Sequence, residues 1–404
     1  MLIKTAALEN GVAEVSFPIE LPLDFEGAPR PKARVQYYGP FRDRVSMANI
    51  SVQFCRALLR EFGESAVAVQ NYVPGGWIDS GLERLSGMNR QAPVAIFYGV
   101  PPDVPELVYE HPVKIGGFVC ETDLIEKVWV RICNRFDLII VPSRWCRDAF
   151  LRSGVSTPIM VVPHGLEPEY KPYGGRPRSG PFIFYNTFYA SSFHSRKSLE
   201  ELVRSFIDAF RGRDDVLLRL RTDNRAKLEE LQQLHDFNNL IRVDPIVEYG
   251  TEDFARIYSQ VHCTVHPSKG EGFGMVPFQS IACETPVIAP HATGMADYLS
   301  EQNSIRLNTS GRVAGEGVGN STGTYFAIDE HHLTDRLRYV VDNWRAEHEK
   351  VKRAGPPFRQ RYRWDNVLLN FIGLVRELLT AREGPDVRII SRYLDGIELT
   401  SSAR

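Results

Sequence analysis

The sequence predicts an α/β protein of two domains, each built on a parallel β-sheet with helices on both faces. Apolar segments typical of buried strands alternate with amphipathic segments typical of helices over residues 34–163, and the alternation restarts after residue 181. Residues 170–181 between the two halves are rich in Gly and Pro, as expected of a hinge. A chain of 404 residues is long enough for two such domains, each with its own core.

In the first half, residues 1–30 alternate only weakly and predict a strand and a turn. Strands are then expected at residues 34–38, 66–69, 93–98, 114–120, 137–142 and 159–163. Apolar residues recur at helical spacing in the segments between them, which predicts helices at residues 51–62, 124–133 and 143–153. Gly63 is a stop signal for the first of these helices.

The second half repeats this pattern and ends in helices. Strands are expected at residues 182–185, 216–220, 241–243, 263–266 and 286–289. Helices are expected at residues 197–211, 226–237, 251–261, 277–284, 331–351 and 364–383. The last helix has an apolar face that predicts packing against the first domain, formed by Leu368, Phe371, Val375 and Leu378. We therefore divide the chain into residues 1–172, residues 173–362, and a returning C-terminal helix with its tail at 363–404.

Composition excludes several classes of protein. A net charge of −2 excludes a globally basic nucleic-acid coat, although a local basic groove remains possible. No apolar run approaches the roughly 18 residues that a membrane-spanning helix needs, and the N-terminal residues do not resemble a signal peptide. The six cysteines have no metal-ligand spacing, so we expect free thiols in a reducing compartment and a cytoplasmic protein.

The most informative segment is residues 265–289, which predicts a strand, a glycine-rich loop, a helix and a second strand. Gly270, Gly272 and Gly274 allow the backbone to approach a ligand closely. The N-terminus of the following helix would direct its free N–H groups at that loop, which suits a phosphate or a diphosphate. The segment has neither the Walker A pattern nor the dinucleotide-binding fingerprint. Glu271 would lie among these amides as a carboxylate able to accept hydrogen bonds from sugar hydroxyls. The alternative is that the glycines only form a tight turn.

This segment resembles the signature of retaining GT-B glycosyltransferases with the E-x7-E motif, the glycogen-synthase-like and mannosyltransferase-like family. Their pattern P-S-x-x-E-G-F-G, a proline, a second Glu and A-x-G-T-P-V-I-A is matched here by Pro267, Ser268, Glu271–Gly274, Pro277, Ala282 and Thr285–Ala289. Further matches are Val141–Ser143, Val161–Gly165, Ser195–Lys197, Gly294, Asp297 and Trp364. The resemblance covers roughly residues 35–382. The chain departs from the pattern at the second acidic position, which is Gln279.

The resemblance implies two Rossmann-like domains that face each other across a cleft. It also implies transfer of a sugar from a nucleotide-diphosphate sugar, a UDP- or GDP-sugar, to an acceptor hydroxyl with retention of configuration. The first domain would bind the acceptor and the second the donor. The resemblance implies no metal and no cofactor apart from the donor substrate. No D-x-D motif ends a strand, in agreement with metal-independent transfer.

Donor-binding residues follow from the same resemblance. Arg196 and Lys197 are the candidates for the donor diphosphate, because two cations suit two phosphate groups and stabilise a departing nucleoside diphosphate. A solvated helix terminus is the alternative for this pair. Gln279 would keep a ribose contact without the charge of the usual Glu. The diphosphate would also lie on backbone amides at Gly272, Phe273, Gly274 and Met275.

Glu121 is the candidate catalytic residue of the first domain. It follows the predicted strand at 114–120, where relatives often carry a His that faces the reacting sugar, so it could position the acceptor hydroxyl or help to remove its proton. The alternative is that residues 121–123 only cap the next helix, which Thr122 or Asp123 would do without Glu121. With Glu271 placed against sugar hydroxyls, same-face attack assisted by the leaving phosphate is favoured over double displacement.

Two other classes of function remain open, a non-catalytic nucleotide-sugar-binding scaffold and a GT-B nucleotide-sugar epimerase. The acceptor is unresolved among an anionic glycan, a lipid phosphate and a nucleic acid with hydroxymethylated bases. Two basic clusters could bind a polyanion, or they could be charges on a solvated surface: Arg30, Lys32, Arg34, Arg42 and Arg44, and Lys350, Lys352, Arg353, Arg359, Arg361 and Arg363.

Overall fold

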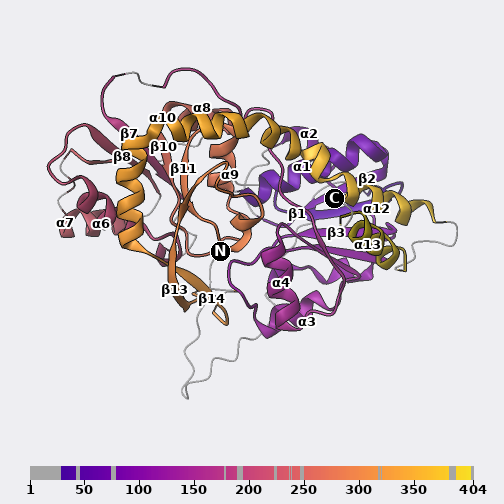
Figure 1. Cartoon of the computed structure of the whole chain (residues 1–404). Helices are drawn as coiled ribbons and strands as arrows, with labels where there is room; N and C mark the ends of the chain where they lie inside the picture. Colours follow the sequence, from indigo (N-terminus) through magenta and orange to yellow (C-terminus); the bar gives the residue numbers. More distant parts are fainter. Residues whose placement is uncertain are drawn as a thin grey trace, which may run out of the picture.

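A computed structural model of the chain describes residues 29–41, 46–73, 79–176, 179–188, 194–222, 225–235, 237, 239–245, 250–316, 319, 321–381 and 388–401. The predicted N-terminal strand and turn, together with Arg42 and Arg44, lie outside these residues apart from 29 and 30. Figure 1 shows two lobes, with the first half of the chain in one and the second half in the other.

The first domain is a six-stranded parallel sheet in the order β2-β1-β3-β4-β5-β6. Its strands are β1 (Val35–Gly39), β2 (Val67–Asn71), β3 (Val94–Tyr98), β4 (Val113–Gly117), β5 (Leu138–Val141) and β6 (Ile159–Val161). The helices are α1 (Ser46–Phe62), α2 (Ser80–Glu83), α3 (Lys127–Cys133) and α4 (Arg144–Ser153), with short turns η1 (Glu64–Ala66), η2 (Pro101–Asp103) and η3 (Glu106–Glu110). The strands are buried, as continuous apolar segments predict.

The second domain is a separate six-stranded parallel sheet in the order β12-β11-β10-β7-β8-β9, the strand order of a Rossmann fold. Its strands are β7 (Phe182–Thr187), β8 (Val216–Arg221), β9 (Ile241–Val243), β10 (Cys263–Val265), β11 (Val287–Pro290) and β12 (Ile305–Leu307). Its helices are α5 (His194–Lys197), α6 (Leu199–Phe210), α7 (Arg225–Leu234), α8 (Thr251–Gln260) and α9 (Met275–Ala282), with a turn η4 (Thr293–Asp297). The prediction of two parallel α/β domains is confirmed.

The C-terminal helices lead back to the first domain, as their apolar face predicts. They are α10 (Glu330–Arg361), which is irregular at Asn343, α11 (Trp364–Val367), α12 (Leu369–Thr380) and α13 (Arg388–Ser401). The side chains of Phe371, Val375 and Leu378 are buried in one core with Val35 and Phe54 of the first domain. Figure 1 accordingly shows α12 and α13 beside β1–β3, while α10 lies along the second domain.

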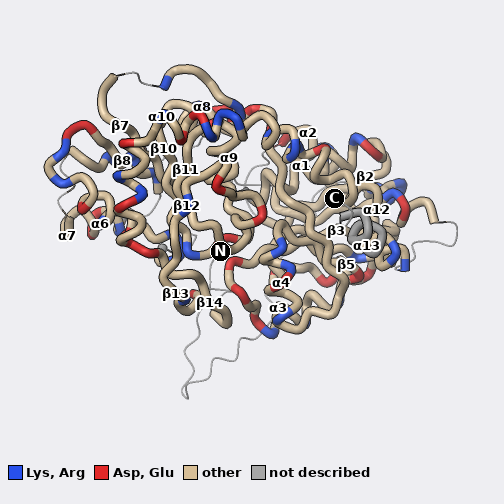
Figure 2. The backbone as a smooth tube through the Cα atoms, in the orientation of Figure 1, with Lys and Arg blue, Asp and Glu red and all other residues tan. Residues whose placement is uncertain are grey.

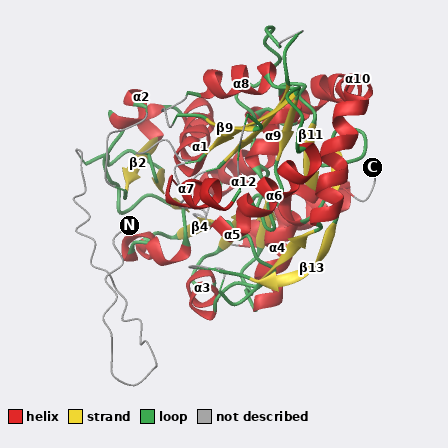
Figure 3. Cartoon of the chain, turned by 90° about the vertical axis from the view of Figure 1, so that its left-hand side faces the viewer, coloured by secondary structure: helices red, strands yellow, loops and turns green. Residues whose placement is uncertain are grey.

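Three strands were not predicted, namely β12 and the antiparallel hairpin of β13 (Thr309–Ala314) and β14 (Thr324–Ile328). The sequence of β13 is polar and contains Gly311, and most of its residues are exposed, so it has no apolar pattern to identify it. Figure 3 shows β13 at the edge of the molecule, and the hairpin forms a sheet of its own. Helix α10 is also longer than the predicted 331–351, because it continues through Pro356 and Pro357.

Charged residues of both signs are mixed over the two domains (Figure 2). In the second basic cluster, Arg359 pairs with Glu284 at 2.9 Å and Lys352 with Glu349 at 3.5 Å. Such pairs favour the interpretation of that cluster as a mixed charged surface, and a polyanionic acceptor stays a prediction. Among the residues described, none of the helices combines the length and apolar character needed to cross a bilayer.

Candidate active site

The loop from His266 to Gly274 connects β10 to α9, and hydrogen bonds from η4 hold it in place. The backbone N–H of Gly294 donates to the carbonyl oxygen of Glu271 at 2.9 Å, and the N–H of Glu271 donates to Oγ1 of Thr293 at 3.2 Å. Gly274, with φ of 88°, turns the chain into the helix. Helix α9 therefore begins at Met275, two residues before the predicted Pro277. Its first N–H groups face the loop without intrahelical partners, as the anion-binding interpretation requires.

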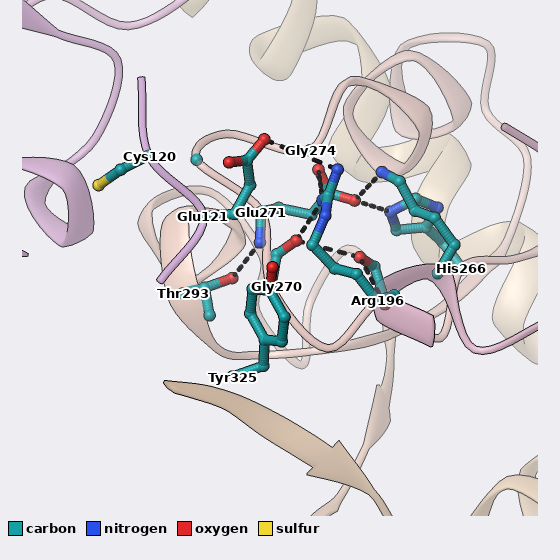
Figure 4. Close-up of polar contacts among 12 residues, drawn as sticks. Cys120, Glu121, Arg196, His266, Gly270, Glu271, Gly274, Thr293 and Tyr325 are labelled. Carbon is teal, nitrogen blue, oxygen red and sulfur yellow. Dashed lines mark hydrogen bonds and ion pairs between the residues drawn. The ribbon is translucent and has the colours of Figure 1, made fainter. Parts of the chain in front are cut away.

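Glu271 is the centre of a buried charge cluster, drawn in Figure 4. Its Oε1 accepts hydrogen bonds from Nζ of Lys197 and, at 2.9 Å, from Nε2 of His266. Its Oε2 lies 3.4 Å from Nη1 of Arg196. Arg196 also donates from Nη1 to the carbonyl oxygen of Gly270 at 2.5 Å. The predicted sugar-binding carboxylate and the predicted diphosphate cations thus lie in direct contact.

Electrostatics in this cluster favour the charged carboxylate. Burial alone would raise the pKa of Glu271, but Lys197 and Arg196 outweigh it and hold this pKa well below its usual range. Burial lowers the pKa of Lys197, and the neighbouring Arg196 lowers it further. Burial lowers the pKa of Arg196, but the carboxylates of Glu121 and Glu271 reverse the effect and raise it. Burial also lowers the pKa of His266, so a neutral imidazole with its proton on Nε2 donates to Glu271.

Arg196 and Lys197 lie on the short helix α5, and not on the first turn of the predicted 197–211 helix. Ser198 adopts the left-handed conformation with φ of 53°, and α6 begins only at Leu199. This break turns both cations away from the axis of α6 and toward the loop. Since they are buried against carboxylates, the alternative of a solvated helix terminus is wrong.

The first domain contributes Glu121, whose Oε1 lies 3.6 Å from Nη2 of Arg196. The main chains of the two domains also approach each other closely beside Glu121. Oγ of Ser143 donates to the carbonyl oxygen of Gly272 at 2.6 Å, and a Cβ on Gly272 would lie 2.9 Å from the carbonyl oxygen of Cys120. The loop that follows β4 therefore meets the glycine-rich loop of the second domain.

The alternative role of residues 121–123 as a helix cap is not what the structure shows. Helix α3 begins at Lys127, and Glu126 precedes it without a capping side-chain hydrogen bond. Oδ1 of Asp123 instead accepts from the backbone N–H of Thr324 at 2.7 Å, in the β13–β14 hairpin.

The remaining predicted donor residues differ in exposure. The Phe273 side chain is buried against Phe278 and Tyr298, with ring centroids 4.9 and 5.3 Å away, so only its backbone could contact a donor. Gln279 lies one turn into α9 and is half-buried. Its Oε1 accepts from the hydroxyl of Tyr258 at 3.3 Å, which fixes the orientation of the amide.

Sequence reasoning missed His266, Thr293 and Tyr325. His266 directly follows β10, where side chains of a parallel sheet approach a ligand, and this position was the one available signal. Thr293 and Tyr325 reach the loop from η4 and β14, which no local pattern connects to it. Among the described residues, no group of three His, Cys, Asp or Glu side chains could hold a metal ion. Metal-independent transfer stays a prediction.

A family profile described as "Family 4 Glycosyltransferase in conflict systems" matches residues 197–370, which include Lys197, the glycine-rich loop and α9. The matched segment covers most of the second domain and part of the C-terminal helices, which is less than half of the chain. No curated protein matches the sequence at a significant level.

Solved structures similar to this chain share its GT-B fold of two facing α/β domains. The sucrose-phosphate synthase of Thermosynechococcus elongatus has a TM-score of 0.62 and 16% identity, over 86% of this chain and 99% of that one. Anabaena HepE with UDP and glucose has a TM-score of 0.65 and 11% identity, over 85% and 100%. The pneumococcal O-GlcNAc transferase GtfA with UDP and GlcNAc has a TM-score of 0.53 and 14% identity, over 71% of this chain; the match spans 57% of GtfA.

Proposed function

We propose that this protein transfers a sugar from a UDP-sugar to an acceptor hydroxyl with retention of configuration and without a metal ion. The observation that carries the proposal is the contact of Lys197 and Arg196 with Glu271 at the N-terminus of α9. Two cations and a helix N-terminus suit a diphosphate, and a carboxylate beside them suits sugar hydroxyls. UDP is favoured over GDP because the similar structures of HepE and GtfA hold UDP.

In this proposal Lys197 and Arg196 stabilise the negative charge that develops on the leaving UDP. The bond between the anomeric carbon and the phosphate oxygen breaks, and its electron pair leaves with UDP. The acceptor oxygen forms a bond to the anomeric carbon on the same face, and its proton passes to an oxygen of the leaving phosphate. Glu271 holds the sugar hydroxyls, and Glu121 orients the acceptor from the first domain. The products are UDP and a glycoside of unchanged configuration.

Binding and turnover test this proposal separately. UDP should raise the melting temperature of the protein more than GDP does, in buffer with EDTA. A panel of UDP-sugars should then be incubated with anionic glycan, lipid-phosphate and hydroxymethylated DNA acceptors, and the product's anomeric configuration read by NMR. Stabilisation by UDP without any turnover would favour a binding scaffold. Epimerised nucleotide sugar without acceptor would favour an epimerase, and an inverted product would contradict retention.

A further inference from the structure

The β13–β14 hairpin lies across both loops of the candidate site. Three consecutive residues of β14 each make a different contact. The N–H of Thr324 donates to Asp123 of the first domain at 2.7 Å, and its carbonyl oxygen accepts from the N–H of Asp123 at 3.3 Å. The N–H of Phe326 donates to the carbonyl oxygen of Lys269 at 3.0 Å. Between them, the ring of Tyr325 packs under Gly270, as Figure 4 shows.

Gly270 shows how closely these parts fit. A Cβ at this position would lie 2.6 Å from Cδ1 of Tyr325 and 2.7 Å from the carbonyl oxygen of Glu121. The residue before Glu271 is thus enclosed between the hairpin and the main chain of Glu121. The hydroxyl of Tyr325 donates to the carbonyl oxygen of Glu316 at 3.1 Å, which anchors the ring at its far end. The spacing between Glu121 and Glu271 therefore depends on β14.

Asp123 is the residue through which the hairpin holds the Glu121 loop. Its Oδ1 accepts from the N–H of Thr324, and its Oδ2 accepts from Oγ1 of Thr324 at 3.0 Å and from Nη1 of Arg312. Arg312 is oriented in turn by a hydrogen bond from Nη1 to Oγ1 of Thr324 at 2.9 Å and by packing of its guanidinium 4.5 Å from the centre of the Phe326 ring. Charge-assisted contacts with several fixed donors hold a carboxylate more firmly than one surface ion pair does.

We propose that Asp123 and Arg312 are positioning residues for the transfer reaction. They hold the loop after β4 on the hairpin, so that Glu121 stays 3.6 Å from Arg196, the same guanidinium that contacts Glu271 at 3.4 Å. This inference rests on the proposed function, because it assigns Glu121 to the acceptor side of the same site. Neither Asp123 nor Arg312 touches the reacting atoms. Their effect passes through the geometry of Glu121.

The experiment is a double-mutant cycle on the full chain with the UDP-sugar and acceptor that support turnover. Asp123→Ala should lower kcat roughly ten- to a hundredfold, because a displaced reacting group loses alignment, while the KM for the donor changes much less. Arg312→Ala should lower kcat in the same direction but less, since both bonds from Thr324 to Asp123 remain. In Glu121→Gln protein, Asp123→Ala should cause little further loss, because residues that act as a unit are not additive.

Arg135→Ala is the matched control, since it removes an exposed ion pair with Glu106 on the same domain at 2.8 Å and should leave kcat unchanged. Hydrogen exchange over residues 119–126 provides a second measurement, and it should accelerate in Asp123→Ala but not in Arg135→Ala. Unchanged kcat in a folded Asp123→Ala variant, or a loss that simply adds to that of Glu121→Gln, would overturn the positioning role and leave the proposed function intact. A wild-type protein that bound no UDP and transferred no sugar would overturn both.

Discussion

Lys197 and Glu271 form a buried ion pair, with Nζ bonded directly to Oε1. Burying a carboxylate without partners costs free energy, because the charge loses its hydration. Lys197 offsets this cost together with Arg196 and His266, which also contact Glu271. The donor diphosphate would bind cations that already have a carboxylate partner. Donor binding and the placement of Glu271 are therefore coupled, and this coupling gives the first two predictions.

Glu271→Gln should lose most sugar transfer and still bind UDP. Replacing a charged acceptor by a neutral amide removes roughly 1.5–3 kcal/mol from a charge-assisted contact, so we expect kcat/KM to fall about ten- to a hundredfold. UDP should bind at least as tightly, because one competing carboxylate has gone from Lys197 and Arg196. Steady-state kinetics and UDP titration measure these two effects separately. Glu252→Gln, which breaks the exposed Arg256–Glu252 pair on α8, is the control. Full activity of a folded Glu271→Gln variant would contradict the assignment of Glu271 to the sugar-binding site.

Lys197→Ala should lose both sugar transfer and UDP affinity, whereas Glu271→Gln should lose only transfer. It removes a cation proposed to stabilise the leaving UDP, so the activation barrier should rise by roughly 2–4 kcal/mol and UDP affinity should fall. Thermal stability should fall as well, since Glu271 loses a buried partner. Lys227→Ala, which removes a more exposed lysine of the same domain, should leave kcat/KM and UDP affinity unchanged. Unaltered UDP affinity in Lys197→Ala would remove Lys197 from the diphosphate site.

Gln279→Ala should raise the KM for the donor with little effect on kcat. Gln279 is proposed to bind the ribose, and a neutral hydrogen bond contributes about 1 kcal/mol, which corresponds to a three- to tenfold change. Gln279→Glu should be tolerated or lower KM, since the hydroxyl of Tyr258 can donate to the carboxylate as it does to the amide. A large loss of kcat in Gln279→Ala, with KM unchanged, would show that Gln279 acts on the chemical step instead.

Gly294→Ala should displace the glycine-rich loop. A Cβ on Gly294 would lie 2.1 Å from the carbonyl oxygen of Gly272 and 2.9 Å from that of Glu271, both of them backbone atoms that cannot rotate away. We expect at least a tenfold loss of transfer and a destabilisation of about 1–3 kcal/mol from overpacking. In Gly174→Ala, by contrast, the new Cβ meets no atom within 4 Å, and activity and stability should match the wild type. Activity measurements and denaturant titration of both variants decide between steric displacement and a general glycine effect.

The sequence predicted those parts of the site that are local. The strand, loop and helix at 265–289 lie within one short segment, and the predicted pair Arg196 and Lys197 does contact Glu271. Contacts from distant elements could not be predicted in this way. Tyr325 reaches Gly270 from a hairpin whose first strand has no apolar pattern, and the Ser143–Gly272 bond spans two domains.

Glu284 departs from the resembled sequence pattern, and a tertiary contact explains the departure. It stands at the Gly position of the resembled pattern A-x-G-T-P-V-I-A, and its φ of 57° is in the left-handed region that favours glycine. Its carboxylate pairs with Arg359 of α10 at 2.9 Å, a contact that offsets part of the backbone strain. No local pattern could reveal that partner, because Arg359 lies on α10, 75 residues later in the chain.

The last prediction concerns the segment that connects the two domains, where Oε2 of Glu167 is buried without a hydrogen-bond partner. Burial of its carboxyl group, reinforced by Glu169, raises the pKa of Glu167 to about 7, and Trp364 and Arg56 only partly oppose the shift. Since the ordinary pKa is 4.5, the folded protein binds this proton more tightly than the unfolded chain does. This contribution to stability is therefore fully present below pH 4.5 and is lost as the pH rises toward and through 7.

Glu167→Gln should remove this dependence, because the amide stays neutral at every pH. The free energy of unfolding of the variant minus that of the wild type should rise by on the order of 2 kcal/mol between pH 5 and pH 8. Taking this difference cancels the opposite contributions of His164 and His348, whose pKa values burial lowers to about 3 and about 4. Urea titrations at several pH values measure it, and Glu83→Gln, at an exposed position of α2, should show no such trend. A difference that stayed constant from pH 5 to pH 8 would mean that Glu167 titrates alike in the folded and unfolded chains.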